Sequence, residues 1–302
     1  MIKNITKLFN KKQFPKLEYL NNLPLGAILI NSNKKQYIVA IVDGSNYNHE
    51  VVLSNLDGTF EKILLSLSSA NAKIAKDSEN FYIVTSQGKN SRIYKFSNRS
   101  LILQLSKDLG DTNVQSIAAD NYYLYLSDSK NGLIHKLDKS LITVELIDTK
   151  KYDRKNVSWV SEYITSTNNG YISIGLPKDE EEFYNMQRFL LEKFPRKIVP
   201  ENNQINSIAY DKNNKRLFIA FSNFIAIIQN NQCSSFLYFK RQLITSIVYD
   251  NDINSLIISS GSLKKNFSGS VNILSNDDID NMKNFILPFE FIIANEDVKK
   301  LK

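Results

Sequence analysis

Residue types that build chemical centres are scarce in this sequence. Its 302 residues include one cysteine, two histidines and one tryptophan. The single cysteine, Cys233, excludes an intramolecular disulfide and a zinc site made of several cysteines. No Gly-rich phosphate loop, nucleophile elbow or HExxH motif is present. We therefore expect no cofactor and no metal centre, and no residue can be assigned a catalytic role.

Long apolar runs are also missing. No stretch reaches the roughly 18 consecutive apolar residues of a membrane-spanning helix. The first residues of the chain lack the apolar centre of a secretory signal peptide. We expect no transmembrane segment and no secretion by such a signal, and hence a cytoplasmic or virion-associated protein.

What the sequence does contain is a globular composition, with 42% of its residues hydrophobic and 23% charged. The net charge of +7 has two interpretations. It is typical of a chain with an anionic partner such as nucleic acid. It also follows from AT-rich coding, which enriches lysine, asparagine and isoleucine, and we favour this second interpretation.

An internal sequence repeat is the strongest indication of the fold. Segment 71–101, NAKIAKDSENFYIVTSQGKNSRIYKFSNRSL, matches segment 114–141, VQSIAADNYYLYLSDSKNGLIHKLDKSL. Further along, 205–222 matches 244–261 without a gap, and weaker copies begin near 27 and 157. One apolar marker residue recurs in each copy at intervals of 39 to 48 residues: Ile30, Ile74, Ile117, Val160, Ile208 and Ile247. Six strand-rich units of this length are typical of propeller blades, because one small sheet cannot cover both of its own faces.

The pattern inside each unit also fits a blade. The second strand is apolar at nearly every residue, as in 81–84 and 122–126, which predicts burial between neighbouring sheets. Later positions such as 93–96 and 134–137 mix in polar residues, as expected toward the outer edge of a blade.

An aspartate follows the first strand in four of the units, at Asp77, Asp120, Asp211 and Asp250. We interpret these residues as turn formers whose carboxylates accept hydrogen bonds from the amides that follow. Because they are spread around the ring, we expect that they cannot converge on one substrate.

The third unit resembles the NHL repeat, a six-bladed propeller family, at Leu126, Ser127, Asp128, Ser129, Asn131, Ile134, Lys136 and Asp138. The second unit resembles it less closely, and the other units are degenerate. The Gly-His and Trp-Asp pairs of WD repeats are absent. The resemblance implies a six-bladed β-propeller that binds protein, RNA or small molecules, more than it implies a reaction.

Two alternatives to a scaffold stay open. Six-bladed propellers of the gluconolactonase class hold a divalent ion with carboxylate and amide side chains, so a metal-dependent lactonase-like hydrolase is one of them. An RNA- or single-stranded-DNA-binding propeller is the other, because aromatic and basic residues interleave at 236–241. His49 and His135 fall in outer-strand positions of different units, so we expect both to point away from the central channel.

Segment 178–197 interrupts the strand pattern between the fourth and fifth units. Its apolar residues have helical spacing, at Phe183, Met186, Leu190 and Phe194. Acidic residues crowd its start and basic residues its end, which complements a helix dipole. The segment predicts an inserted amphipathic helix that lies on the propeller or docks a partner.

The first 24 residues form a basic arm, with Lys3, Lys7, Lys11 and Lys12 and no acidic residue before Glu18. Such an arm can bind a partner's groove or an anionic surface, or can contribute a strand that closes the ring. Segment 285–293 predicts a final outer strand.

These features predict an all-β protein: a six-bladed β-propeller over 25–302, preceded by the arm 1–24 and interrupted by one helix. The predicted function is a non-enzymatic binding or scaffold protein, as a subunit of a multiprotein complex or a virion. The expected partner is a protein, and nucleic acid is less favoured. The predicted partner-binding residues are Lys3, Lys7, Lys11, Lys12, Phe183, Met186, Leu190 and Phe194.

Overall fold

The computed structural model describes most of the propeller region predicted from the sequence. The described residues are 23–43, 48–69, 71–88, 90–149, 159–167, 170–177, 205–229, 232–239, 242–262 and 269–283. The basic arm up to residue 22, the predicted helix at 178–197 and the predicted strand at 285–293 lie outside them.

The described strands form antiparallel sheets, each built from strands that are consecutive in the chain. The first sheet contains β1 (Pro24–Ser32), β2 (Lys35–Val42), β3 (Asn48–Asn55) and β4 (Phe60–Ser68). The second contains β5 (Asn71–Lys76), β6 (Asn80–Gln87), β7 (Asn90–Ser97) and β8 (Leu103–Asp111). The third contains β9 (Val114–Ala119), β10 (Leu124–Asp128), β11 (Leu133–Leu137) and β12 (Thr143–Asp148).

The second half of the chain continues the series. The two-stranded sheet that follows contains β13 (Trp159–Thr167) and β14 (Gly170–Pro177). The next contains β15 (Ile205–Asp211), β16 (Arg216–Phe221), β17 (Phe224–Gln229) and β18 (Gln232–Tyr238). The last contains β19 (Gln242–Asp250), β20 (Ser255–Ser262) and β21 (Gly269–Ser275).

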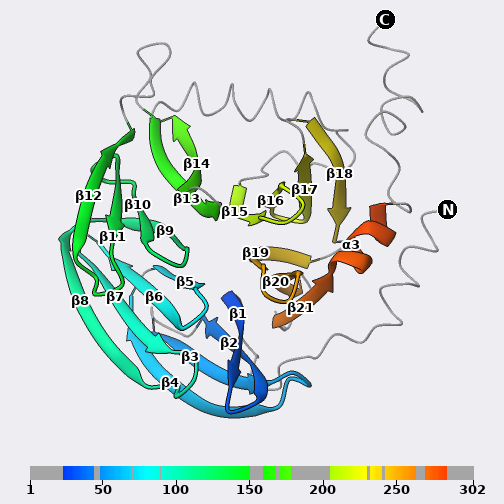
Figure 1. Cartoon of the computed structure of the whole chain (residues 1–302), viewed down its shortest axis with the longest axis horizontal. Coiled ribbons are helices and arrows are strands. Elements are labelled where there is room, and N and C mark those ends of the chain that lie inside the picture. The colour runs from blue at the N-terminus through cyan, green and yellow to red at the C-terminus, as the bar shows by residue number, and fades with distance from the viewer. Residues whose placement is uncertain are drawn as a thin grey trace, which may run out of the picture.

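The sheets stand in a ring around a common axis (Figure 1). The first strand of each sheet is innermost and contacts the first strand of the next sheet, in the order β1, β5, β9, β13, β15 and β19. Strand β19 also contacts β1, so the ring closes. This is the architecture of a β-propeller, and it confirms the predicted fold class.

The number of blades differs from the prediction of six. The described residues form five blades of three or four strands, and the fourth position in the ring is occupied by the two-stranded sheet β13–β14. Segment 178–204, which follows β14 in the chain, lies outside the described residues.

Polar side chains link the inner strands to one another around the ring. Each of these hydrogen bonds runs from one inner strand to the next, in the pairs Asn71 with Gln115, Ser116 with Ile164, Tyr163 with Ile205, Ser207 with Ile247, and Thr245 with Pro24. The last pair joins β19 to β1 and so closes the ring with the same kind of contact as the others. No described sheet combines strands from both ends of the chain. The described part of the ring is therefore closed by packing between the first and last sheets.

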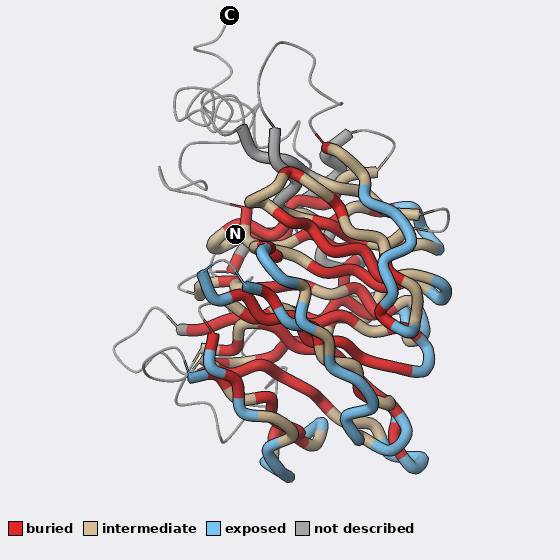
Figure 2. Tube along the Cα trace, turned by 90° about the vertical axis from the view of Figure 1, so that its left-hand side faces the viewer, coloured by how far each residue is buried: buried red, intermediate tan, exposed pale blue. Residues whose placement is uncertain are grey.

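The core lies between the sheets, where the second strands are sandwiched. All residues of β10 and all but the last of β6 are buried, which confirms the prediction for this position. Two residues of the predicted buried run differ, because β10 begins at Leu124: Tyr122 is 76% exposed in the turn before it, and Tyr123 is only partly buried. In Figure 2 the outer strands facing the viewer are largely exposed, whereas the strands behind them are buried.

A helix that the sequence analysis missed follows the last sheet. Helix α3 (Asn276–Lys283) begins after Ser275, whose hydroxyl accepts a hydrogen bond from the Asp278 backbone N–H at 3.2 Å. The Asp278 carboxylate in turn accepts from the Ser275 backbone N–H, which is the reciprocal pattern of a capping box. The helix contacts β18 and β21 and thereby joins the last two blades. In the part of the chain that the structure describes, no helix has the length and apolarity needed to cross a membrane.

Candidate binding site at the mouth of the central channel

A cavity of about 130 Å³ lies at the centre of the ring, lined by residues of five inner strands. Its lining includes one isoleucine from each of these strands: Ile74, Ile117, Ile164, Ile208 and Ile247. In the fourth unit the equivalent of the marker isoleucine is therefore Ile164, and the prediction of Val160 is wrong. A regular spacing of the units predicts the marker at Val160. Strand β13, however, is longer than β5 or β9 and has a register shift between Ser161 and Tyr163, so the equivalent position lies further along the chain.

One end of the cavity is surrounded by the turns that follow the inner strands, and the repeated aspartates shape these turns. Oδ1 of Asp77 accepts the backbone N–H groups of Glu79 at 2.8 Å and Asn80 at 2.7 Å. Oδ1 of Asp120 accepts those of Tyr122 and Tyr123, both at 2.7 Å. The turn-forming role predicted for the aspartates is thus confirmed.

The second carboxylate oxygen takes a side chain five residues further along. Asp77 accepts the Tyr82 hydroxyl at 2.8 Å, and Asp120 accepts the Tyr125 hydroxyl at 2.9 Å. Burial is the main cause that raises the pKa of both tyrosines, and the neighbouring carboxylate adds to it. Each tyrosine therefore donates its proton to the carboxylate throughout the physiological pH range.

In the fifth sheet an arginine takes the place of the tyrosine. Arg216 is 2% exposed, and its Nε and Nη2 donate to Oδ2 of the buried Asp211 at 2.9 and 2.6 Å. Its Nη1 donates to Asp280 on α3 at 2.8 Å. Although burial opposes the charged form of Arg216, Asp211 and Asp280 raise its pKa. The same guanidinium therefore binds the turn-forming Asp211 and also holds helix α3 against the ring.

Lysines connect the turns of different sheets. Nζ of Lys139, in the turn after β11, donates to Oδ2 of Asp77 in the neighbouring sheet at 2.6 Å. Nζ of Lys76, at the end of β5, lies 2.5 Å from Oδ2 of Asp250, at the end of β19. The second pair joins the second sheet to the last one. These two sheets are not neighbours in the ring, because the first sheet lies between them.

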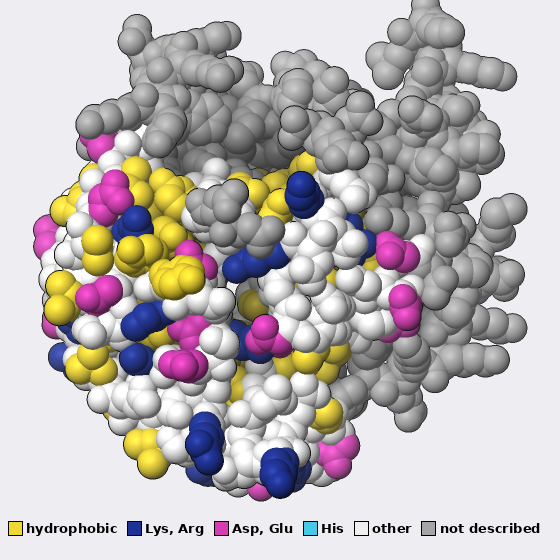
Figure 3. All heavy atoms as spheres, in the orientation of Figure 1, with side chains coloured by type: hydrophobic (Ala, Val, Ile, Leu, Met, Phe, Trp, Pro, Cys, Tyr) yellow, Lys and Arg dark blue, Asp and Glu magenta, His cyan; other side chains and the backbone are white. Residues whose placement is uncertain are grey.

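The expectation that the repeated aspartates cannot converge on one substrate is not tested, but three of the four lie around one cavity and Asp211 does not. Asp77, Asp120 and Asp250 all line the same cavity, together with Asp252. The reason is geometric: the inner strands surround the axis closely, so residues at their ends meet at one opening. Figure 3 shows a hollow at the centre of the ring with basic and acidic side chains beside it.

Lys212 adds another cation to this opening. It follows Asp211 in the turn after β15 and lines the cavity. Burial lowers the pKa of Lys212, while the nearby carboxylates of Asp120 and Asp252 partly oppose this shift. Lys212, Asp120 and Asp252 therefore line the same cavity from three different sheets.

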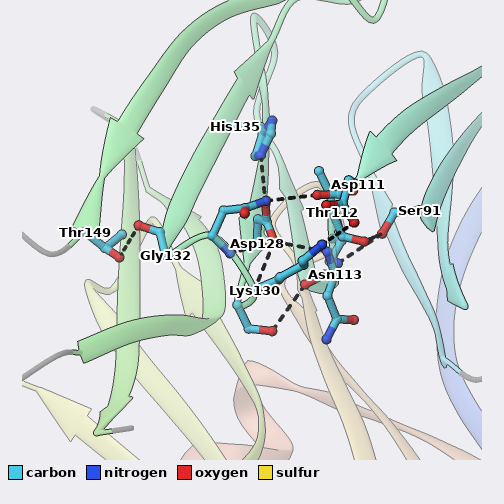
Figure 4. Close-up of polar contacts among 12 residues, drawn as sticks. Ser91, Asp111, Thr112, Asn113, Asp128, Lys130, Gly132, His135 and Thr149 are labelled. Atoms are coloured by element: carbon cyan, nitrogen blue, oxygen red, sulfur yellow. Dashed lines mark hydrogen bonds and ion pairs between the residues drawn. The ribbon is translucent and has the colours of Figure 1, made fainter. Parts of the chain in front are cut away.

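A second polar cluster lies in the turn between β10 and β11 (Figure 4). Oδ1 of the buried Asp128 accepts the backbone N–H groups of Asn113 at 3.0 Å and Lys130 at 3.1 Å. Its Oδ2 accepts the Asn131 amide at 2.6 Å and lies 3.3 Å from Nε2 of His135. These contacts fill the carboxylate and hold the turn against the preceding loop, so we interpret the cluster as structural.

The two histidines lie on the third strands of their sheets, His49 on β3 and His135 on β11. Neither is among the residues that line the central cavity. His49 is buried, with Nδ1 3.2 Å from Oδ1 of Asp43. Across the described ranges, no three His, Cys, Asp or Glu side chains are grouped so that they could hold a metal ion.

The partner-binding residues predicted from sequence are not tested. Lys3, Lys7, Lys11, Lys12, Phe183, Met186, Leu190 and Phe194 all lie outside the described residues. The residues that sequence reasoning missed are Lys76, Lys139 and Lys212. Lys76 and Lys212 directly flank repeated aspartates, which is a signal that the sequence offered, whereas the role of Lys139 depends on contact between two sheets.

Comparison with known proteins supports the fold. No family model matches the chain, and no curated protein matches it. The crystal structure of the RRP9 WD40 repeats is similar, with a TM-score of 0.53 and 10% sequence identity, over 85% of this chain and 96% of that one. The structure of U3-55K has the same TM-score and identity, over 85% of this chain and 97% of that one.

The chain has a β-propeller fold. At 10% identity the likeness shows the fold alone. The NHL repeat therefore stays a resemblance of the third unit, because no family model confirms it.

Acid is expected to weaken the capped turns. Burial alone would raise the pKa of Asp128, but its hydrogen bonds lower it from 3.8 to about 2, and the pKa values of Asp77 and Asp211 are lowered as well. Because these values lie below those of the unfolded chain, the stabilisation is complete above about pH 5 and is lost as the pH falls toward about 2. For Asp128 this amounts to about 2 kcal/mol. Urea unfolding between these pH values is expected to show a smaller pH dependence for Asp128→Asn, and an equal dependence would contradict the assignment.

Proposed function

We propose that the protein is a non-enzymatic scaffold that docks another protein on the outer strands of its first three blades. The observation that carries this proposal is the position of the exposed apolar side chains. Ten large hydrophobic side chains are exposed in the described residues, and all but Tyr122 lie on β4, β8 and β12 or in the turns that lead into these strands. We call this set the outer rim: Leu56, Phe60, Ile63, Ile102, Leu103, Leu105, Ile142, Val144 and Leu146.

The outer rim has the chemistry of a protein interface. Its side chains are 38–64% exposed, and they recur at the same position in three consecutive blades. Single exposed apolar residues are normal on a protein surface, but a grouped set is typical of an interaction site. The strands that carry them form the outer edges of their sheets, so the rim is accessible along the side of the ring (Figures 1 and 2).

The rest of the ring supports a rigid binding role. The carboxylates of Asp77, Asp128 and Asp211 are engaged with turn amides and side chains, and their contacts fix loops. A framework held in this way presents its surface without reorganisation, which lowers the cost of binding.

Three further parts of the chain belong to the proposal. The sheet β13–β14 is the inner half of a sixth blade, and its support is that β13 contacts β9 on one side and β15 on the other, as the other inner strands contact their neighbours. The basic arm and segment 178–197 are further docking elements, and the protein acts within a multiprotein complex or a virion.

Polar substitution of the rim is expected to weaken partner binding. Replacing Ile142, Val144 and Leu146 together by serine should reduce capture of the partner about tenfold or more, because buried apolar anchors carry most of the energy of an interface. The partner is identified by crosslinking and mass spectrometry of the tagged wild-type chain, and its recovery is then compared between variants.

The matched control is Tyr122→Ser, which removes an even more exposed apolar side chain outside the outer rim. Both variants are compared with the parent by thermal unfolding, so that lost binding is not confused with lost folding. Deletions of 1–16 and 178–197 test the other two elements. If the rim variant and both deletions recover the partner as well as the parent does, the scaffold proposal is wrong.

A further inference from the structure

The outer strands of the first three sheets differ in how well their free edges are protected against pairing with another strand. Bulges and charged residues usually provide this protection. Register shifts interrupt β4 in two places and leave Glu61 and Leu64 without opposite residues on β3, so no long regular stretch remains. Strand β12 carries Glu145 and Asp148 and no basic residue, so it offers no opposite charge to a second copy of itself.

Strand β8 lacks both kinds of protection at its centre. It is nine residues long and is the last strand of its sheet, so no described strand pairs with its outer side (Figure 1). Its register shifts lie toward its two ends, and residues 105–108 are regularly opposite 92–95. Its one lysine, Lys107, donates from Nζ to the Leu141 carbonyl at 2.7 Å. That ammonium is therefore directed at the third sheet and does not cover the edge.

Backbone groups at the centre of β8 face alternately toward β7 and toward the outer side. The Ser97 N–H donates to the Ile102 carbonyl at 3.1 Å. Because bonded and non-bonded pairs alternate along an antiparallel ladder, the backbones of Leu105 and Lys107 then face β7. The N–H and C=O groups of Ser106 face outward, where an added strand can bond them.

The side chains of β8 are complementary to a second copy of the same strand. A two-fold axis through Ser106 places Gln104 opposite Asp108 of the other copy, and Leu105 opposite its Lys107. No like charges then face each other, and the Gln104 amide can donate to the Asp108 carboxylate. An axis through Lys107 or Asp108 would place the same charge opposite itself, which is destabilising.

The Asp108 carboxylate has capacity for this contact. Its Oδ1 accepts the Gly110 N–H at 2.8 Å, and its Oδ2 lies 3.9 Å from Nη2 of Arg92. Since a carboxylate has about four acceptor positions, these contacts leave room for the amide of Gln104 from another copy.

We propose that the protein forms a homodimer in which two β8 strands pair antiparallel about Ser106 and join two four-stranded sheets into one. The pairing uses the backbone edge of β8, so the rim side chains of β4 and β12 stay accessible to another protein. The dimer presents two outer rims, so a partner with two binding segments is held more tightly than by one rim. This self-association is a property of the chain alone and does not depend on the scaffold function.

Sedimentation equilibrium of the purified full chain tests the proposal. The average mass is expected to rise with concentration from 34.6 kDa toward twice this value. Ser106→Pro removes the outward N–H, at an edge position where proline is tolerated, and is expected to weaken the dimer at least about tenfold. Leu146→Pro on β12 is the matched control and is expected to leave the dimer unchanged. A parent mass that stays at 34.6 kDa at every concentration would overturn the proposal.

A disulfide tests the register without a proline. In a chain with Cys233→Ser, Ser106→Cys places two cysteines opposite each other across the axis, with a Cα separation of about 5.5 Å that suits a disulfide. Air oxidation is expected to give a covalent dimer. In the control Gln104→Cys, the two cysteines are four residues out of register, about 13 Å apart, and are expected to stay reduced. Equal disulfide yields in the two variants, or a dimer that Ser106→Pro does not weaken, would contradict the assignment to β8.

Discussion

Replacing Arg216 by methionine is expected to lower the free energy of unfolding by about 3–5 kcal/mol. Methionine fills much of the same volume but leaves Asp211 without its guanidinium partner, and Asp211 is fully buried. Removing one member of a buried ion pair is costly because the other charge stays away from water without compensation. The variant also loses the contact with Asp280, which helps hold α3 against the ring. Urea unfolding of parent and variant at neutral pH measures the change.

The matched control for this prediction is Arg92→Met. Arg92 is half-exposed, and its Nη2 lies 3.9 Å from Oδ2 of the exposed Asp108. An exposed pair of this kind contributes about 1 kcal/mol or less. A similar loss of stability in the two variants would show that Arg216 does not hold the buried contacts described above.

Replacing Asp77 by alanine is expected to cost about 3 kcal/mol, the second large effect. The substitution removes the acceptor for two turn amides, for the Tyr82 hydroxyl and for Lys139. Tyr82 is fully buried, so its hydroxyl loses its partner where water does not easily replace it. Lys139 loses one of the contacts that join the second and third sheets.

Tyr82→Phe and the double variant with Asp77→Ala separate these contributions by a double-mutant cycle. The cycle is expected to show coupling between the two residues, whereas additive losses would contradict the hydrogen bond. Asp57→Ala is the control for capping alone, because Asp57 accepts Thr59 in an exposed turn and has no buried lysine. Its loss of stability is expected to be much smaller than that of Asp77→Ala.

Sequence reasoning succeeded where the structure depends on local contacts. The turn-forming role of Asp77, Asp120 and Asp211 is set by amides two and three residues further on, so a repeated aspartate after a strand was sufficient to predict it. The ring itself was predictable because strands of similar length recur at a nearly constant interval, and each sheet needs neighbours on both faces.

Contacts between sheets could not be read from the repeat. The pair of Lys76 and Asp250 joins the ends of β5 and β19, and only the closure of the ring brings them together. The convergence of the aspartates on one cavity has the same cause. In the fourth unit, the longer β13 displaced the marker from Val160 to Ile164, which a search based on mean spacing does not detect.

The surface was also harder to predict than the core. Segments 93–96 and 134–137 lie toward the outer edge as expected, on the third strands β7 and β11, and a fourth strand lies outside each of them. The outermost strands β8 and β12 mix apolar with polar residues, and the order of strands in each sheet shows that the apolar ones are exposed. The outer rim could therefore not be recognised from composition alone.

A disulfide across the closure of the ring tests the central claim most directly. A β-carbon added at Gly26 on β1 would lie 3.9 Å from the β-carbon of Ser246 on β19, which is close to the separation found in disulfides. In a chain with Cys233→Ser, the pair Gly26→Cys and Ser246→Cys is expected to oxidise to an intramolecular disulfide with no free thiol left. The control pair Gly26→Cys and Ser116→Cys, with Ser116 on β9 two sheets away, is expected to keep both thiols. A folded protein in which the first pair stays reduced under the same conditions would contradict a closed ring of sheets.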